Sequence, residues 1–249
     1  MGSRKKLLLV MLGAGALGIC AVAGFFLLRA ESEPGPVTGP APAAHLFREP
    51  DTSIASIRLR VFYAVPSNRV DMVDSSWLAL VQPALEDSAE FHRLQLRGLS
   101  KLDYEIYGEP TILEHENLFY DTSSTDKGNP EALRRIVPEL ERRFPDLTAS
   151  RPGEFSVIAV IYEGVGAAGS EGAMILSRTF LADEQYRSFR SALFYHEFGH
   201  TIGLPDQYDL DSGTPFSRDI MGAGRRTPLE RNYIDSSLLK DLGVIEGES

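Results

Sequence analysis

The stretch HEFGHTIGLPDQYD at residues 196–209 decides how the chain is interpreted. His196 and His200 are one helical turn apart, so both imidazoles project from the same face of a helix. Neutral imidazole nitrogens are good zinc ligands. Glu197 follows the first histidine and can reach a metal-bound water without being a ligand, which is the H-E-x-x-H arrangement with the glutamate as general base. The spacing therefore predicts a zinc site on a helix.

The residues after the second histidine predict a sharp turn. Gly203 can adopt the left-handed conformation that ends a helix, and Pro205 prevents the helix from resuming. A turn at this point can bring the carboxylate of Asp206 back toward the metal. His196, His200 and Asp206 would then form a set of three ligands, with a fourth position open for water as a catalytic zinc site requires.

A methionine follows in the sequence DIMG, residues 219–222. HEFGHTIGLPD followed by DIMG resembles the metzincin metalloproteases, whose signature is H-E-x-x-H-x-x-G-x-x-H and a methionine turn. Asp206 stands where the third histidine would be, a variant found in the snapalysin-like and immune inhibitor A families, and GLPDQYD resembles the latter most closely. The resemblance implies zinc at His196, His200 and Asp206, Glu197 as general base, and Met221 beneath the metal.

The order of the predicted elements indicates an α/β or α+β domain. Alternating or continuous apolar residues predict strands at 57–63, 102–107, 155–162 and 173–180. Capping residues and apolar positions predict helices at 74–97, 129–144, 188–202 and 229–242. We therefore expect a metzincin-like fold, with a mixed, mostly parallel twisted sheet and an antiparallel edge strand. By the resemblance, residues 173–180 would be the edge strand that pairs with substrate, 188–202 the active-site helix and 229–242 the C-terminal helix.

The N-terminal segment predicts attachment to a membrane. Residues 7–28 are uncharged and apolar, and their number is close to the ~20 residues that a helix needs to cross a bilayer. The segment 1–6 before them carries Arg4, Lys5 and Lys6 and should therefore stay cytoplasmic. The Pro/Gly/Ala-rich residues 29–52 are expected to be a linker, and 53–249 the metalloprotease domain outside the cytoplasmic membrane, in the periplasm or outside the cell. The alternative is a cleaved signal peptide and a secreted protein.

Composition limits the partners. The formal net charge of -10 argues against nucleic acid, because phosphate binding needs patches of Lys and Arg. Cys20 is the only cysteine, so neither an intramolecular disulfide nor a zinc site built on several cysteines is possible. Asp209 and Asp211 offer carboxylates to a calcium ion, or form a solvated acidic loop.

Other polar residues carry no ligand spacing. His45, His92 and His115 have no partner at that spacing, and we expect them to lie on the surface. Arg225 and Arg226, after the methionine, are expected to be exposed charges.

The motif predicts a zinc-dependent endopeptidase that hydrolyses protein or peptide substrates through a zinc-bound water activated by Glu197. Two alternatives stay open at this stage. One is a non-catalytic zinc module of the same fold that binds peptides without cutting them, although an intact Glu197 argues against it. The other is a zinc hydrolase of non-peptide amides.

Overall fold

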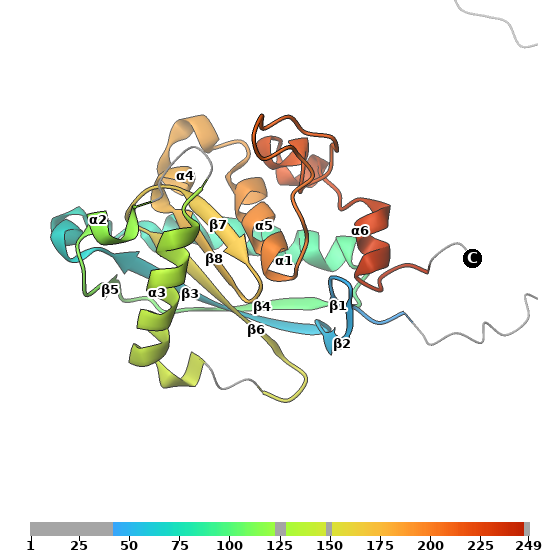
Figure 1. Cartoon of the computed structure of the whole chain (residues 1–249), viewed down its shortest axis with the longest axis horizontal. Helices are drawn as coiled ribbons and strands as arrows, with labels where there is room; N and C mark the ends of the chain where they lie inside the picture. The colour runs from blue at the N-terminus through green and yellow to red at the C-terminus, as the bar shows by residue number, and fades with distance from the viewer. Residues whose placement is uncertain (1–41, 123–127, 148–150, 247–249) are drawn as a thin grey trace, which may run out of the picture. The chain divides into compact units, whose positions relative to one another are not determined.

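A mostly parallel sheet forms the centre of the fold (Figure 1). The computed structural model describes residues 42–122, 128–147 and 151–246. The main path of the sheet has the order β4-β3-β6-β8-β7, and β5 pairs with β3 beside it. The strands are β3 (Ser56–Val65), β4 (Lys101–Ile106), β5 (Thr111–Ile112), β6 (Phe155–Tyr162), β7 (Ala167–Ser170) and β8 (Ala173–Ser177). Among the described strands of this sheet, only β7 and β8 pair antiparallel, so the predicted mixed sheet with an antiparallel edge is confirmed.

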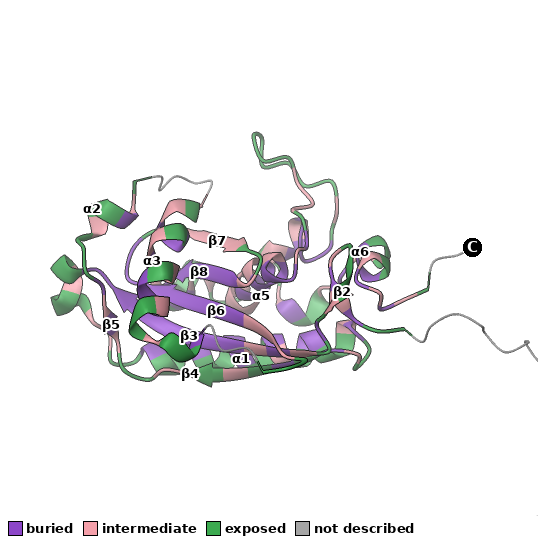
Figure 2. Cartoon of the chain, turned by 60° about the horizontal axis from the view of Figure 1, so that its bottom comes forward, coloured by how far each residue is buried: buried purple, intermediate pink, exposed green. Residues whose placement is uncertain are grey.

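Helices cover both faces of the sheet. One hydrophobic core lies between the sheet and the helices α1 (Trp77–Gln95), α5 (Arg190–Thr201) and α6 (Ser236–Asp241). The other lies between the sheet and α3 (Pro130–Arg143) with α2 (Asn117–Tyr120). Successive residues of a strand point to opposite faces, so β3, β6 and β8 supply both cores and are buried almost throughout, as Figure 2 shows.

The predicted helices are present, with one correction. Asn129 caps α3 by accepting a hydrogen bond from the Ala132 N–H, and Pro130 occupies the first turn, as the sequence predicted. The helix expected at 229–242 is broken, because Asn232 is extended and Asp235 caps a new helix, α6. The remaining short helices are α4 (Arg178–Ala182), η1 (Ser67–Met72), η2 (Pro145–Leu147), η3 (Glu184–Tyr186), η4 (Ala223–Arg226) and η5 (Leu229–Arg231).

The edge strand differs from the prediction. Residues 173–180 were expected to form the edge strand, but β8 ends at Ser177 and residues 178–180 belong to α4. β8 lies inside the sheet between β6 and β7, and its five residues AMILS are all buried. The edge is β7, in the glycine-rich segment before it. Gly166 and Gly172 have φ of 91° and 73°, and so supply the left-handed backbone that begins and ends this short strand.

Gly169 on β7 lets the edge strand approach α5 closely. A Cβ atom at Gly169 would lie 2.3 Å from the Glu197 carbonyl oxygen and 2.6 Å from His200 Cβ. Gly169→Ala is therefore expected to push β7 away from α5 and lower the free energy of unfolding by about 1–3 kcal/mol. Gly108→Ala is the control, since nothing lies within 4 Å of a Cβ there. Denaturant unfolding of both variants tests this, and equal stability would contradict the close approach.

The chain is ordered ahead of the predicted domain boundary at residue 53. Strands β1 (His45–Leu46) and β2 (Glu49–Ser53) form an antiparallel pair within the expected linker. Ala44 and Leu46 are buried, and the Phe47 N–H donates to the Ile202 carbonyl at 3.1 Å. The folded part therefore begins before residue 53, in a Pro/Ala-rich segment that was predicted to be a linker.

The predicted cytoplasmic segment 1–6 and the predicted membrane span 7–28 lie outside the described residues. Within the residues that the structure describes, no helix combines the length and apolar character needed to cross a bilayer.

His92 is buried, contrary to the surface position expected for it. It lies on α1 with no exposed area, its Nδ1 is 3.1 Å from the Tyr195 hydroxyl and its Nε2 is 2.7 Å from Ser100 Oγ. Ser100 donates its own proton to the Ile54 carbonyl, so its oxygen accepts from Nε2–H and leaves Nδ1 to accept from Tyr195. This contact ties α1 to the helix that carries the zinc motif.

Burial of His92 predicts a pH-dependent stability. Loss of water lowers the pKa of His92 to about 3, whereas an unfolded histidine titrates near pH ~6.5. The contribution of His92 is therefore complete above pH ~6.5 and falls by about 1.4 kcal/mol per pH unit below it, because only the unfolded chain takes up the proton. Unfolding free energies between pH 7 and 5 should show this slope in wild type and His115→Gln, and a shallower slope in His92→Gln. Parallel curves for wild type and His92→Gln would refute it.

Candidate metal centre

Helix α5 presents the two histidines of the motif side by side, with ring centroids 4.9 Å apart. Each ring uses its Nδ1 on a backbone carbonyl: His196 on Ile220 at 3.1 Å, and His200 on Leu204 at 2.8 Å. A carbonyl only accepts, so both Nδ1 atoms carry the proton and both Nε2 atoms keep a free electron pair. This is the tautomer that a metal ligand needs.

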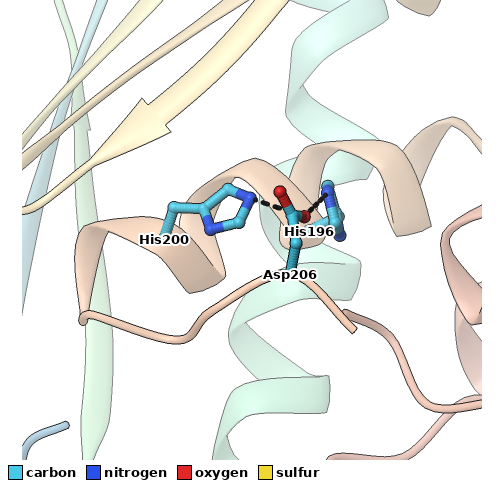
Figure 3. A group of neighbouring side chains, drawn as sticks. All are labelled: His196, His200 and Asp206. Carbon is cyan, nitrogen blue, oxygen red and sulfur yellow. Dashed lines mark ion pairs between the residues drawn. The ribbon is translucent and has the colours of Figure 1, made fainter. Parts of the chain in front are cut away.

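Asp206 closes the group from the turn after the helix (Figure 3). Gly203 has φ of 85° and its N–H donates to the His200 carbonyl at 3.1 Å, so α5 ends where the sequence predicted. The reversed chain brings Asp206 Oδ1 to 3.4 Å from His196 Nε2 and 3.3 Å from His200 Nε2. The structure thus brings the three predicted ligands together.

The separations of Asp206 Oδ1 from the two histidine nitrogens fit zinc. Zinc bonds to nitrogen and oxygen ligands are ~2.0–2.1 Å long, which puts tetrahedral ligands about 3.3 Å apart. The two nitrogen–oxygen separations, 3.4 and 3.3 Å, have this size. Asp206 Oδ1 is also buried without a hydrogen-bond partner in the described part of the chain. A buried carboxylate oxygen is costly to leave without a hydrogen bond, so the site favours a cation at this point.

The charges around the site also favour a bound cation, because they keep Asp206 ionised. Burial acts to raise the pKa of Asp206, but the imidazoles of His196 and His200 outweigh it and hold this pKa well below its usual range. Burial acts to lower the pKa of His200, but Asp206 and Glu197 outweigh it and raise this pKa. Asp206 therefore stays ionised, as a metal ligand must be.

Glu197 lies on α5 between the two ligands and is partly buried. Burial raises its pKa, and the nearby imidazoles of His196 and His200 act in the opposite direction. A carboxylate with a raised pKa holds a proton more readily than an exposed one, which suits a group that takes up and returns a proton.

Met221 is fully buried beneath α5. A Cβ atom at Gly199 would lie 2.6 Å from Met221 Sδ, so the glycine inside the HEFGH motif makes room for the methionine. The turn around Met221 also holds the site together, since Ile220 supplies the carbonyl for His196 and the Met221 carbonyl accepts from the Gln207 N–H at 2.9 Å. The sequence contains a signal for this close packing in Gly199. A glycine in a helix interior lowers stability, so its presence there indicates a packing reason.

The structure does not support the calcium site considered at Asp209 and Asp211. Asp209 Oδ1 accepts from the N–H groups of Asp211 at 3.1 Å and Ser212 at 2.6 Å, which makes it a cap for its own loop. Among the described residues, the group with metal-ligand spacing contains His196, His200 and Asp206, and neither Asp209 nor Asp211.

Two side chains that sequence reasoning did not place at the site lie beside it. The Tyr208 ring stacks near the His196 ring, with centroids 6.0 Å apart. Arg225 lies over the Tyr208 ring and is partly buried, so the expectation of an exposed charge is wrong for this residue. Arg226 is exposed as expected. Spacing along the chain gives no signal for Arg225, because the loop at 207–217 brings it back to Tyr208.

The sequence matches no family model and no curated protein. Among solved structures, the chain is similar to a zinc-dependent peptidase from Methanocorpusculum labreanum, with 16% identity, a TM-score of 0.44, and coverage of 75% of this chain and 99% of that one. It is also similar to metalloproteinase-II from Bacteroides fragilis, with 14% identity, a TM-score of 0.45 and coverage of 84% of this chain. The chain spans 56% of that metalloproteinase. Similarity at this level transfers no residue roles to this chain.

Proposed function

We propose that the chain is a zinc-dependent endopeptidase of metzincin type, with zinc held by His196, His200 and Asp206. The observation that carries the proposal is that the Nε2 atoms of His196 and His200 lie 3.4 and 3.3 Å from the buried Asp206 Oδ1, which has no hydrogen-bond partner among the described residues. These separations suit ligands of one tetrahedral zinc ion. Three protein ligands leave one position of a tetrahedral ion open, which is the arrangement of catalytic rather than structural zinc sites.

Glu197 is the general base in this proposal. Zinc in such a site supplies a Lewis acid and lowers the pKa of a bound water to about 7. The Glu197 carboxylate takes a proton from the attacking water and returns it to the leaving amine nitrogen. Its place on α5 between the two histidines, together with its raised pKa, supports this role.

The edge strand supports a peptide as the substrate. Among the described strands, β7 pairs with β8, and the Asn129 N–H donates to its first carbonyl, that of Ala167, at 3.0 Å. Further along, β7 packs against α5 at Glu197 and His200. An extended peptide that adds to a sheet edge is held by main-chain hydrogen bonds regardless of its sequence. A peptide paired with β7 would run beside the metal ligands, which favours peptide hydrolysis over the hydrolysis of other amides.

The location of the enzyme rests on the sequence alone. We infer that residues 7–28 anchor the domain on the outer side of the cytoplasmic membrane, with secretion after signal-peptide cleavage as the alternative. Cell fractionation with an antibody against the domain tests this location. A domain found in the cytosol would refute both membrane anchoring and secretion.

Metal removal tests the proposed function. A chelator should abolish cleavage of a denatured protein, added zinc should restore it, and the apo protein should unfold at a lower temperature. The stability change follows because zinc binds the native site only, and at 100 times its Kd adds about 2.7 kcal/mol. Cleavage that persists after complete metal removal would contradict the proposal. Zinc binding without any cleavage would favour the non-catalytic peptide-binding module.

A further inference from the structure

Arg225 is held rigidly beside the metal centre. It lies on η4, directly after the methionine turn, and its Cζ is 3.7 Å from the centroid of the Tyr208 ring. Its Nη1 donates to the Gly222 carbonyl at 2.7 Å. A guanidinium that stacks on an aromatic face and donates to a fixed carbonyl has a defined plane.

A single aromatic ring separates this guanidinium from a metal ligand. Tyr208 follows Asp206 by two residues, and its ring is 6.0 Å from that of His196. Arg225 Cζ is therefore less than about 10 Å from the His196 ring, the span of about three extended residues. A substrate group one or two residues from the peptide bond held at the metal can therefore reach Arg225.

Arg225 has no carboxylate at ion-pair distance among the described residues. Other partly buried arginines do: Arg178 pairs with Glu163 at 2.5 Å, and Arg58 pairs with Glu105 at 2.5 Å. A guanidinium has five N–H donors, and Arg225 uses one of them on a protein oxygen in the described part of the chain. Asp206 and Glu197 act on Arg225 only from beyond ion-pair distance. Keeping a cation partly out of water without a carboxylate in direct contact costs free energy, and a ligand anion in contact would offset that cost.

We propose that Arg225 recognises a carboxylate of the substrate close to the bond that is cleaved. The inference rests on the proposed function and deepens it by naming the substrate class. The fork of the guanidinium matches a carboxylate with two parallel hydrogen bonds, and the stack on Tyr208 presents that fork in a fixed orientation. The whole chain, with its formal net charge of -10, repels acidic peptides in general, so recognition of an acidic group needs a local cation of this kind.

The carboxylate has two sources, which peptides can separate. One is an Asp or Glu side chain next to the cleaved bond of a longer peptide. The other is the free C-terminus of a short peptide. The test uses three quenched fluorescent peptides: one with Glu at the positions flanking the cleaved bond and blocked ends, its Gln counterpart, and the Gln peptide shortened to a free C-terminus.

The measured quantity is the ratio of kcat/KM between an acidic peptide and its neutral counterpart. Wild type should favour one acidic peptide by about 10–100-fold, the size of a charge-assisted hydrogen bond. Arg225→Gln should bring this ratio close to one, and Arg225→Lys, which keeps the charge but loses the fork, should lower it partly. Arg226→Gln removes the neighbouring, exposed charge and should keep the wild-type ratio.

A wild-type ratio near one for both acidic peptides would overturn the inference, and so would a ratio that survives Arg225→Gln. Zinc content and thermal unfolding show that each variant is folded, and if Arg225→Gln does not fold, an unchanged ratio in Arg225→Lys overturns the inference instead. Which acidic peptide wild type favours identifies the source of the carboxylate.

Binding separates this inference from the proposed function. The Kd of the same peptides for zinc-loaded Glu197→Ala, measured by fluorescence anisotropy, requires no turnover. A preference for the acidic peptide that disappears in the Glu197→Ala, Arg225→Gln double variant supports carboxylate recognition even if wild type cleaves nothing. Cleavage of all peptides at equal rates would contradict carboxylate recognition by Arg225 but would still support the proposed peptidase activity.

Discussion

Glu197→Ala is expected to lower kcat/KM for a peptide substrate about 10³-fold while the protein keeps its zinc. The reason is that Glu197 supplies no metal ligand: the group with metal-ligand spacing is His196, His200 and Asp206. Removing the carboxylate takes away the group that accepts and returns the proton, and leaves the ligands in place. Kinetics with a quenched peptide and metal analysis of the same sample measure both quantities.

Glu184→Ala is the matched control, since Glu184 is an exposed carboxylate on η3, outside the site. It should cleave at the wild-type rate. Wild-type activity in zinc-loaded Glu197→Ala would contradict the assigned role and move the general base to another group. Loss of zinc together with activity in Glu197→Ala would mean that this side chain supports the metal.

Asp206→Ala is expected to weaken zinc binding by more than about 100-fold, because even groups that only support a metal ligand cost 10–100-fold when removed. Its Oδ1 is the atom that faces both Nε2 atoms, at 3.4 and 3.3 Å. Without it, two histidines remain and cannot enclose the ion. Competition with a fluorescent zinc chelator measures the affinity, and zinc should no longer raise the unfolding temperature of this variant.

Asp211→Ala removes an exposed carboxylate from the loop that follows Asp206 and is the control. It should bind zinc with the wild-type affinity. Equal zinc affinity in Asp206→Ala and wild type would show that Asp206 does not hold the metal, and the three-ligand geometry would then have no function.

The candidate site was predictable from sequence because its parts are local. The spacing of His196 and His200 follows from one helical turn, and the turn at Gly203 needs only its left-handed backbone. The partners that orient the ligands were harder to find. Leu204 and Ile220 act through their backbone carbonyls, and any residue type can supply a carbonyl. Arg225 reaches the site through a loop whose path the sequence does not specify.

The fold was predictable where burial follows from a run of residues, and less so where distant segments meet. The apolar run of β6 gave a central strand with its observed bounds. By contrast, β7 contains Ala and Gly and has no strand pattern, and only its packing against α5 explains the glycine at 169. His92 is similar: its burial depends on Tyr195 and Ser100, which no periodicity on α1 reveals.

The metal content of the folded part tests the central claim most directly. The compact unit is Ala41–Ser249, and it has to include the buried Ala44 and Leu46 to keep β1 intact. After dialysis against limiting zinc, wild type should bind one zinc per chain, and the Asp206→Ala chain should bind none under the same conditions. A folded wild-type chain that binds no zinc would mean that His196, His200 and Asp206 do not form a metal centre, and the proposed enzyme would fall with it.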